Sequence, residues 1–506
     1  MAYYSLNAYD ADVRINSFAG LYQYGDNMNG DVRFAVDMAN VETPAGVLQP
    51  MAATEEVAEF TGVKIETLAH LFRRWYVGNE SAEVLFAAMD GKIFYTTADQ
   101  TATASWTELP FPTGVTEYQS NVWSWAAYEI NPEGSVASVD VLLMSNALDG
   151  MIMIRGDDFT VEAIETPKKF GVIERYAERI WGGGITDDPD MLVYSAPYDP
   201  TDWEANEDDP AEGAGDINQP SWDGDSFTAL RAFGSQLIAF KKHRVWRVLG
   251  TDPGEYTFKE QYGGGAPYFN TIAIDVERIF MAEKDGVSVY DGLAVDGYQR
   301  QAIDKLWRTV NKDAMDQMCA VLYKKKYYLA VPTGDSTVNN ELIIFNLADG
   351  TILRYTGIYI ESFLATEDVL YATSSVIPGK VLKVNWDSWE TGSATANATF
   401  WVSPWMDFGY KKIKKGGFDL YFTPEVQDRP VTLRFKIQTE KKIKSKSYTV
   451  QPLTANEIAN NKFHKQKRLH FGGTGRRFRL IIETDGGGAP WRLIGGLQMI
   501  VETDPD

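Results

Sequence analysis

The sequence consists largely of short runs in which apolar and polar residues alternate, separated by tight turns. Examples are ERIWGGG, MLVYSA, QLIAFKKHRVWRVLG, RIFMAEKDGVSVYDG, KKKYYLAVPTG and ELIIFNLADGTILRYTG. Alternation with a period of two is typical of half-buried β-strands. Asp-Gly steps, which favour two-residue hairpins because Gly and Asp tolerate positive φ, begin at Asp90, Asp149, Asp285, Asp291 and Asp349. We therefore predict an all-β chain.

The strands fall into successive groups, each opening a meander of three or four strands. New groups begin near Val63, Asn121, Phe170, Phe227, Phe269, Met315 and Tyr359. Their spacing of roughly 45–50 residues is the size of a propeller blade. The pattern predicts an irregular β-propeller of about seven blades over residues 61–395. A pair of sandwiches or a long β-solenoid are the alternatives, and the absence of a strict short period argues against the solenoid.

The two ends of the chain differ from this central part. Residues 1–60 mix turn signals with short extended pieces, so we expect an extended N-terminal arm whose apolar side chains pack on a neighbouring body. Residues 396–506 contain new alternating runs such as FDLYFT, VTLRFKIQT and RLHFGGTGRRFRLIIET, which predict a β-sandwich or jelly roll. The main helical signal starts at Ala302 and is expected to bridge two blades.

Charge is distributed unevenly along the chain, whose formal net charge is −22. Residues 396–506 carry 19 Lys and Arg against 11 Asp and Glu, whereas the remainder carries 29 against 59. This asymmetry suggests two parts with different neighbours. The acidic body argues against tight nucleic-acid binding, because phosphate contacts need Lys and Arg. It suits a surface past which nucleic acid slides, and solubility alone explains it equally well.

The densest acidic stretch is DWEANEDDPAEGAGDINQPSWDGD, residues 202–225, which contains nine carboxylates and no Lys or Arg. Such a segment is expected to be a solvated loop. One interpretation is that it lines a channel and repels polyanions, with Asp202, Glu204, Glu207, Asp208, Asp209 and Glu212 facing that channel. Another is a calcium site at Asp208, Asp209 and Asp216, since hard cations prefer clustered carboxylates. A simple exposed loop is the third.

Basic residues gather in clusters within the C-terminal domain. KKIKK supplies Lys411, Lys412, Lys414 and Lys415, KKIKSK supplies Lys441, Lys442, Lys444 and Lys446, and HKQKR follows at residues 464–468. The alternation in KKIKSK is typical of an exposed or edge strand, where lysines block unwanted sheet pairing. The competing interpretation is that these clusters face the acidic body of a neighbouring subunit, with complementary charge setting the register.

Motifs for catalysis or metal binding are missing from the sequence. The four histidines, His70, His243, His464 and His470, lack metal-ligand spacing, and Cys319 is a single cysteine in an apolar context. HEXXH, GXSXG and phosphate-loop patterns do not occur. We expect no enzyme, no metal and no cofactor. We also expect no secretory signal and no membrane-spanning segment.

Two stretches, MLVYSAPYDPTDW and KIFYTTADQTATASW, resemble the Asp boxes of sialidase propellers. Asp99 precedes Trp106 by seven residues and Asp199 precedes Trp203 by four, whereas an Asp box needs five. Both stretches are therefore predicted to be hairpin corners in which a Trp caps the blade core and the Asp closes an Asx turn.

The order of several motifs carries a family resemblance. These are NVETPAGVLQP, RIWGGGITDDPDMLVYSAPYDPTDW, FTALRAFGSQLIAFKKHRVWRV and, near the end, WMDFG and FGGTGRRFRLII. The chain resembles the propeller-containing tail proteins of tailed bacteriophages, namely the hub, packaged-DNA stabilisation and nozzle proteins of short-tailed phages.

The resemblance implies a structural virion protein that is assembled in the host cytoplasm and forms a homo-oligomeric ring in the tail, usually a hexamer. The ring would contact neighbouring tail and adaptor proteins, retain the packaged genome and let it pass at ejection. Double-stranded DNA would pass through without specific binding, and no membrane would be involved. The alternative is a tail-tip carbohydrate- or receptor-binding propeller with Trp123, Trp125, Trp203 and Trp222 as sugar platforms on one rim. A glycan hydrolase is a third alternative.

Overall fold

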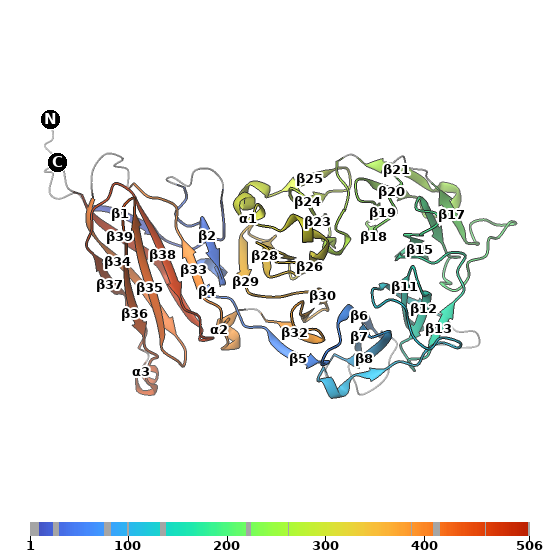
Figure 1. Cartoon of the computed structure of the whole chain (residues 1–506), viewed down its shortest axis with the longest axis horizontal. Coiled ribbons are helices and arrows are strands. Elements are labelled where there is room, and N and C mark those ends of the chain that lie inside the picture. The colour runs from blue at the N-terminus through green and yellow to red at the C-terminus, as the bar shows by residue number, and fades with distance from the viewer. Residues whose placement is uncertain are drawn as a thin grey trace.

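The computed structural model describes residues 10–503 apart from 24–29, 75–81, 99–100, 132–137, 219–223, 262, 386, 408–414 and 461. Two bodies lie side by side in it, a ring of small sheets and a β-sandwich (Figure 1). Both are built almost entirely from antiparallel strands, because alternating side chains let each sheet bury one face against the next.

The ring is a β-propeller with seven four-stranded blades in the described part of the chain. Blade one is β6 (Ile65–Phe72), β7 (Glu83–Met89), β8 (Lys92–Thr97) and β9 (Thr107–Glu108), and blade two is β10 (Ser124–Ile130), β11 (Val139–Asn146), β12 (Gly150–Arg155) and β13 (Val161–Ile164). Blade three is β14 (Val172–Tyr176), β15 (Arg179–Gly183), β16 (Met191–Tyr194) and β17 (Gly215–Asn218), and blade four is β18 (Ala229–Phe233), β19 (Gln236–Phe240), β20 (Val245–Leu249) and β21 (Thr257–Gln261).

Blade five is β22 (Ala273–Ile274), β23 (Ile279–Glu283), β24 (Gly286–Tyr290) and β25 (Val295–Tyr298), and blade six is β26 (Cys319–Tyr323), β27 (Lys326–Val331), β28 (Glu341–Asn346) and β29 (Ile352–Thr356). Blade seven combines β30 (Ser362–Ala365), β31 (Leu370–Thr373) and β32 (Lys380–Val384) with β5 (Glu55–Glu59) from near the N-terminus. The predicted propeller is confirmed, and the predicted group starts precede the first strands, as Val63 precedes Ile65. Pairing of β5 with β32 closes the ring.

The sandwich contains two sheets. One has the order β1 (Asp10–Ile15), β39 (Trp491–Thr503), β34 (Lys415–Val426), β37 (Lys467–Phe471), and the other has β2 (Asp37–Ala39), β33 (Thr399–Val402), β38 (Phe478–Thr484), β35 (Val431–Thr439), β36 (Ile443–Val450). Their inner faces meet in a core where the rings of Phe422 and Phe435 lie 4.4 Å apart between centroids. The N-terminal residues therefore do not form a separate arm. They supply β1 and β2 to the sandwich and β5 to the propeller.

Helices are few and short in the described ranges, and none has the length and apolar character needed to cross a bilayer. They are α1 (Asp304–Trp307), α2 (Ser388–Thr391) and α3 (Ala455–Ala459), with 3-10 turns at Pro44–Gly46, Thr103–Ser105, Pro253–Glu255, Phe269–Thr271, Arg300–Ile303 and Lys312–Gln317. The helical signal near Ala302 corresponds to the turn that continues as α1, between blades five and six, as expected. A further pair of short strands, β3 (Val41–Glu42) and β4 (Gln49–Pro50), completes the N-terminal segment.

Residues 15–23 and 30–53, which we call the N-terminal wedge, pack between the sandwich and blade six. The Phe18 side chain is 3% exposed and its ring lies edge-on to that of Trp401, with 5.2 Å between centroids. On the propeller side, the Leu21 amide donates to the Ile352 carbonyl oxygen at 2.7 Å. The wedge therefore places apolar side chains in a core shared by both bodies.

Polar contacts of the wedge also join both bodies. The side-chain amide of Asn40 donates to Thr356 Oγ1 at 2.9 Å and to the Ala398 carbonyl oxygen at 2.7 Å, while its Oδ1 accepts from the Thr356 amide. Arg354 on β29 pairs with Glu341 at 2.8 Å and with Asp37 of β2 at 3.2 Å. Since Asn40 is almost fully buried, loss of these bonds would leave buried polar groups unpaired.

We expect Phe18→Ala to lower the free energy of unfolding by about 3–5 kcal/mol, because it empties a close-packed site shared by both bodies. Urea denaturation followed by far-UV circular dichroism measures this change. The matched control is Phe463→Ala at a side chain that is 77% exposed, where the change should stay within about 0.5 kcal/mol. Equal effects of the two substitutions would contradict a wedge that holds the bodies together.

Candidate interaction site

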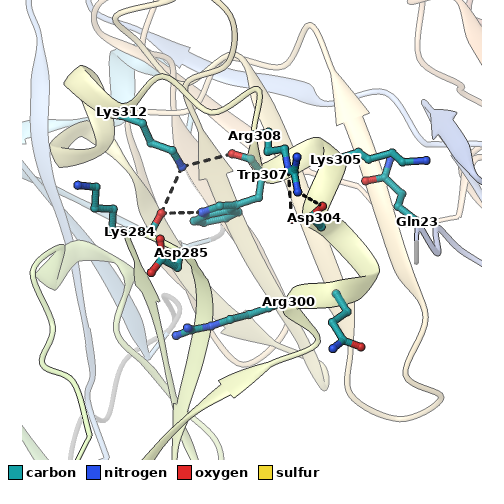
Figure 2. A pocket seen from close by; sticks show the side chains of 10 residues that line it. Gln23, Lys284, Asp285, Arg300, Asp304, Lys305, Trp307, Arg308 and Lys312 are labelled. Atoms are coloured by element: carbon teal, nitrogen blue, oxygen red, sulfur yellow. Dashed lines mark hydrogen bonds and ion pairs between the residues drawn. The ribbon is translucent and has the colours of Figure 1, made fainter. Parts of the chain in front are cut away.

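A pocket of about 530 Å³ lies where blade five meets blade six, beside Gln23 of the N-terminal wedge (Figure 2). The residues that line it are Gln23, Lys284, Asp285, Arg300, Gln301, Asp304, Lys305, Trp307, Arg308 and Lys312. We call it the basic pocket, because Lys and Arg side chains outnumber carboxylates in its lining.

The local sequence explains how these side chains come together. Lys284 and Asp285 form the tight turn between β23 and β24, and Gly286 follows with φ of 140°. A Cβ atom at this glycine would lie 2.7 Å from the Arg300 side chain, so glycine lets that arginine approach the hairpin. The turn and helix from Arg300 to Trp307 then carry the remaining side chains past the hairpin before blade six begins.

Trp307 forms the floor of the basic pocket. Its side chain is 5% exposed, and the indole Nε1 donates to the Lys284 carbonyl oxygen at 3.0 Å. Lys312 Nζ donates to the same oxygen at 3.2 Å and to the Trp307 carbonyl oxygen at 3.3 Å, and it lies 5.3 Å from the centre of the indole ring. Partial desolvation lowers the pKa of Lys312, attraction to Asp285 acts in the opposite direction, and repulsion from Lys284 makes a smaller lowering contribution.

The positive charge of the basic pocket is only partly neutralised. Arg300 pairs with Glu283, and Arg308 pairs with Asp304 at 2.8 Å. Within the described ranges, Lys284, Lys305 and Lys312 form no ion pair with a carboxylate. On a chain of net charge −22, this concentration of ammonium groups around an indole suits an anionic ligand. The lining does not pair a nucleophile with a base, as covalent catalysis would require.

Sequence reasoning missed the basic pocket. The segment AIDKLWRTVNKD predicts only a helical bridge, because its cations are interspersed rather than contiguous. A usable signal was present: Arg300, Lys305, Arg308 and Lys312 fall close together inside an otherwise acidic body. The contribution of Lys284 depends on the hairpin contact and was not visible in the pattern.

The first half of the acidic stretch, residues 202–212, belongs to the connection between β16 and β17, the two outer strands of blade three. Asp202, Glu204, Glu207, Asp208, Asp209 and Glu212 are all exposed there. We call residues 202–212 the acidic loop. Because inner strands surround the propeller axis and β17 lies at the rim (Figure 1), the acidic loop does not face the propeller's own hole. It would reach a channel only through assembly with other copies, so the channel-facing role remains a prediction.

The acidic loop is held at its base by Arg179, a side chain that is 1% exposed. Its guanidinium donates to the Ser195 carbonyl oxygen at 2.7 Å, to the Gly213 carbonyl oxygen at 2.6 Å and to the Ala211 carbonyl oxygen. Farther out, Asn206 Oδ1 accepts from the amides of Asp208 and Asp209. The loop is therefore held by Arg179 at its base and by local turns in which Asp202 and Asp209 also accept from backbone amides.

The calcium expectation for Asp208, Asp209 and Asp216 is not supported. The described residues contain no group of three or more His, Cys, Asp or Glu that could hold a metal ion. Asp208 and Asp209 lie in the exposed turn capped by Asn206, whereas Asp216 belongs to β17. Proximity in sequence did not bring the three carboxylates together, because the strand carries Asp216 away from the turn.

The basic clusters are placed only in part. Lys411, Lys412 and Lys414 lie outside the described residues, and Lys415 begins β34. Lys441 and Lys442 precede β36, and Lys444 and Lys446 are exposed on it. Because β36 is the last strand of its sheet, the prediction of an exposed edge strand is confirmed. A role of these lysines in subunit contact remains a prediction.

Most of the tryptophans proposed as sugar platforms are occupied in packing. Trp123 is 5% exposed, and Trp203 packs against Phe170 with 5.1 Å between ring centroids. The rings of Trp125 and His70 lie 5.3 Å apart between centroids, beside a smaller pocket of about 240 Å³. Trp222 lies outside the described residues. Trp123 is therefore too buried to serve as a platform, whereas Trp125 and Trp203 are half-buried, and the carbohydrate alternative stays a prediction.

Two stretches resemble Asp boxes but are predicted to be hairpin corners, and this prediction is confirmed for those of their residues that the structure describes. Asp199 Oδ1 accepts from the Thr201 amide at 2.8 Å and from Thr201 Oγ1 at 2.6 Å, which forms the expected Asx turn. Trp106 is 9% exposed and packs on Phe60, while Asp99 lies outside the described residues.

Cys319 is buried, and burial raises the pKa of its thiol, so the thiol is suited to packing rather than to nucleophilic chemistry.

Comparisons with known proteins show similarity in fold but not in sequence. No protein-family model matches the chain, and no curated protein matches it. Among solved structures it is similar to BBS1N in complex with ARL6DN, soaked with lead or with mercury. The TM-scores are 0.39 and 0.38 at 10% identity, covering 67% of this chain and 97% or 99% of those chains. The WD40 domain of Neurospora crassa Pan2 gives 0.27 at 8% identity, covering 76% of this chain and 98% of that chain.

We expect Arg179→Met to loosen the acidic loop, because three carbonyl groups lose their buried charged donor. Cleavage by a Glu-specific protease after Glu204, Glu207 or Glu212 should become at least about tenfold faster, since protection follows the free energy of local opening. Arg175→Met, at the more exposed neighbouring arginine, is the control and should cleave at the wild-type rate. Unchanged cleavage in Arg179→Met would contradict the anchoring role.

Proposed function

We propose that the protein is a structural subunit of the tail of a tailed bacteriophage, with no enzymatic activity, whose copies form a closed ring around the DNA channel. The observation that carries this proposal is a separation of charge within one molecule, between an acidic propeller and a basic C-terminal part of the sandwich. A subunit of a ring needs two different surfaces that complement each other, because the contacts repeat head to tail until they close.

The N-terminal wedge supports the proposal because it fixes the distance and angle between the two bodies. A ring closes only if every subunit presents its two surfaces in the same relative orientation. Buried contacts such as those of Phe18 and Asn40 hold that orientation more tightly than a flexible linker would. The acidic loop at the far rim of the propeller and the basic edge strand β36 of the sandwich lie at opposite ends of the molecule (Figure 1).

The acidic surface also suits passage of DNA. Exposed carboxylates without cationic partners repel phosphate, so a wall built from them does not retain the polyanion. Cations are concentrated instead in the basic pocket and on the sandwich. In the proposed ring these surfaces contact protein, either another copy or neighbouring tail and adaptor proteins, and the DNA passes without specific binding.

Native mass spectrometry combined with negative-stain imaging tests the proposal on the purified full chain, alone and mixed with the products of neighbouring genes. We expect closed rings with a central hole whose population falls as salt rises from about 50 to 500 mM, because exposed charge pairs are screened at high ionic strength. A protein that remains monomeric at every concentration, salt level and mixture would contradict the proposed function.

A further inference from the structure

We propose that the basic pocket binds the acidic loop of a second copy of this chain. The inference rests on the proposed function and names a contact by which neighbouring subunits would hold each other. It differs from the interpretation in which the lysine clusters of the sandwich receive the acidic body, since it uses a concave site on the propeller itself.

The acidic loop has the properties of a ligand. Its six carboxylates are exposed, and within the described ranges none of them pairs with a Lys or Arg side chain. Arg179 holds the base of the loop, and the turn at Asn206 shapes its tip. Because the backbone is already fixed, binding would cost less conformational entropy than ordering a flexible segment.

The basic pocket has the complementary properties of a receptor. Within the described residues, the ammonium groups of Lys284, Lys305 and Lys312 form no ion pair with a carboxylate, and Asp285 and Asp304 are the two carboxylates of the lining. Trp307 provides an apolar floor, and the lowered pKa of Lys312 reflects partial removal of water from its ammonium group. A volume of about 530 Å³ is within the usual range for ligand pockets, so it admits the tip of a loop.

The two surfaces cannot meet within one copy. Strand direction alternates along each blade, so the connection between its third and fourth strands lies on the opposite face from the turn between its second and third. The acidic loop is a connection of the first kind in blade three. The basic pocket instead lies at the turn between the second and third strands of blade five and at the link to blade six. In addition, α1 lies toward the sandwich, whereas β17 lies at the far rim (Figure 1). The contact therefore joins two different surfaces of two copies, and such contacts generate rings when they repeat head to tail.

The sandwich edge is the less suitable receptor for the acidic loop. Lys444 and Lys446 stand on an exposed edge strand, where lysines commonly serve to prevent sheet pairing. Charges on such a surface remain hydrated, and exposed ion pairs contribute little. The lysines of the basic pocket are also exposed, but they converge with two arginines around Trp307 in a concave site, so several of them can contact one loop at once.

Charge reversal on each side tests the contact in the full-length protein. The loop variant carries Glu207→Lys, Asp208→Lys and Asp209→Lys, and the pocket variant carries Lys284→Glu and Lys305→Glu. Sedimentation velocity should show that either variant alone associates at least about a hundredfold more weakly than the wild type, because like charges then face each other. An equimolar mixture should associate again, since each new charge meets its opposite.

The mixture also serves as a folding control, because only folded chains can restore association. A further variant with Lys444→Glu and Lys446→Glu on the sandwich edge should associate like the wild type. If the edge variant loses association while the pocket variant keeps it, the inference is overturned and the proposed ring stands. Association of both reversed variants at wild-type strength would also overturn it. A wild-type chain that never associates would instead remove the proposed function and the contact together.

Discussion

The architecture depends on strand pairing between the beginning of the chain and segments hundreds of residues away. β1 pairs with β39, β2 pairs with β33, and β5 pairs with β32 to close the propeller. Between these strands, Phe18 and Asn40 fill the space between blade six and the sandwich. The same segment thus completes both bodies and joins them, so the arrangement of acidic and basic surfaces follows from it.

Because the two bodies are held in a fixed arrangement, charges that are compensated inside the molecule can be distinguished from charges that remain on its surface. The carboxylates of the acidic loop stay exposed and form no ion pair within the described residues, while the cations of the basic pocket gather around Trp307 on a hairpin and a short helix. Buried charge is compensated inside the molecule where it occurs, as with Arg179 and its three carbonyl partners. Exposed charge that is not compensated internally remains for contact with other molecules, which is the property that the proposed ring uses.

Local patterns in the sequence were enough to predict the blades, because alternation and Asp-Gly turns act over a few residues. They failed for the N-terminal segment, since the partners of β1, β2 and β5 are distant in sequence and short edge strands carry little periodic signal. The same distinction holds for the site. Composition predicted exposure of the acidic loop and the edge position of KKIKSK, but the rim position of the loop and the convergence of Lys284 with Lys312 depend on tertiary packing.

Hydrogen exchange measured by mass spectrometry tests most directly whether the N-terminal wedge holds the two bodies together. The amides of Leu21 and Asn40 donate to the carbonyl oxygens of Ile352 and Arg354 on β29. They should exchange as slowly as the amides of blade six, because both would be released only when the bodies separate. Rapid exchange across residues 18–40 while blade six and the sandwich remain protected would show that the wedge does not hold them together.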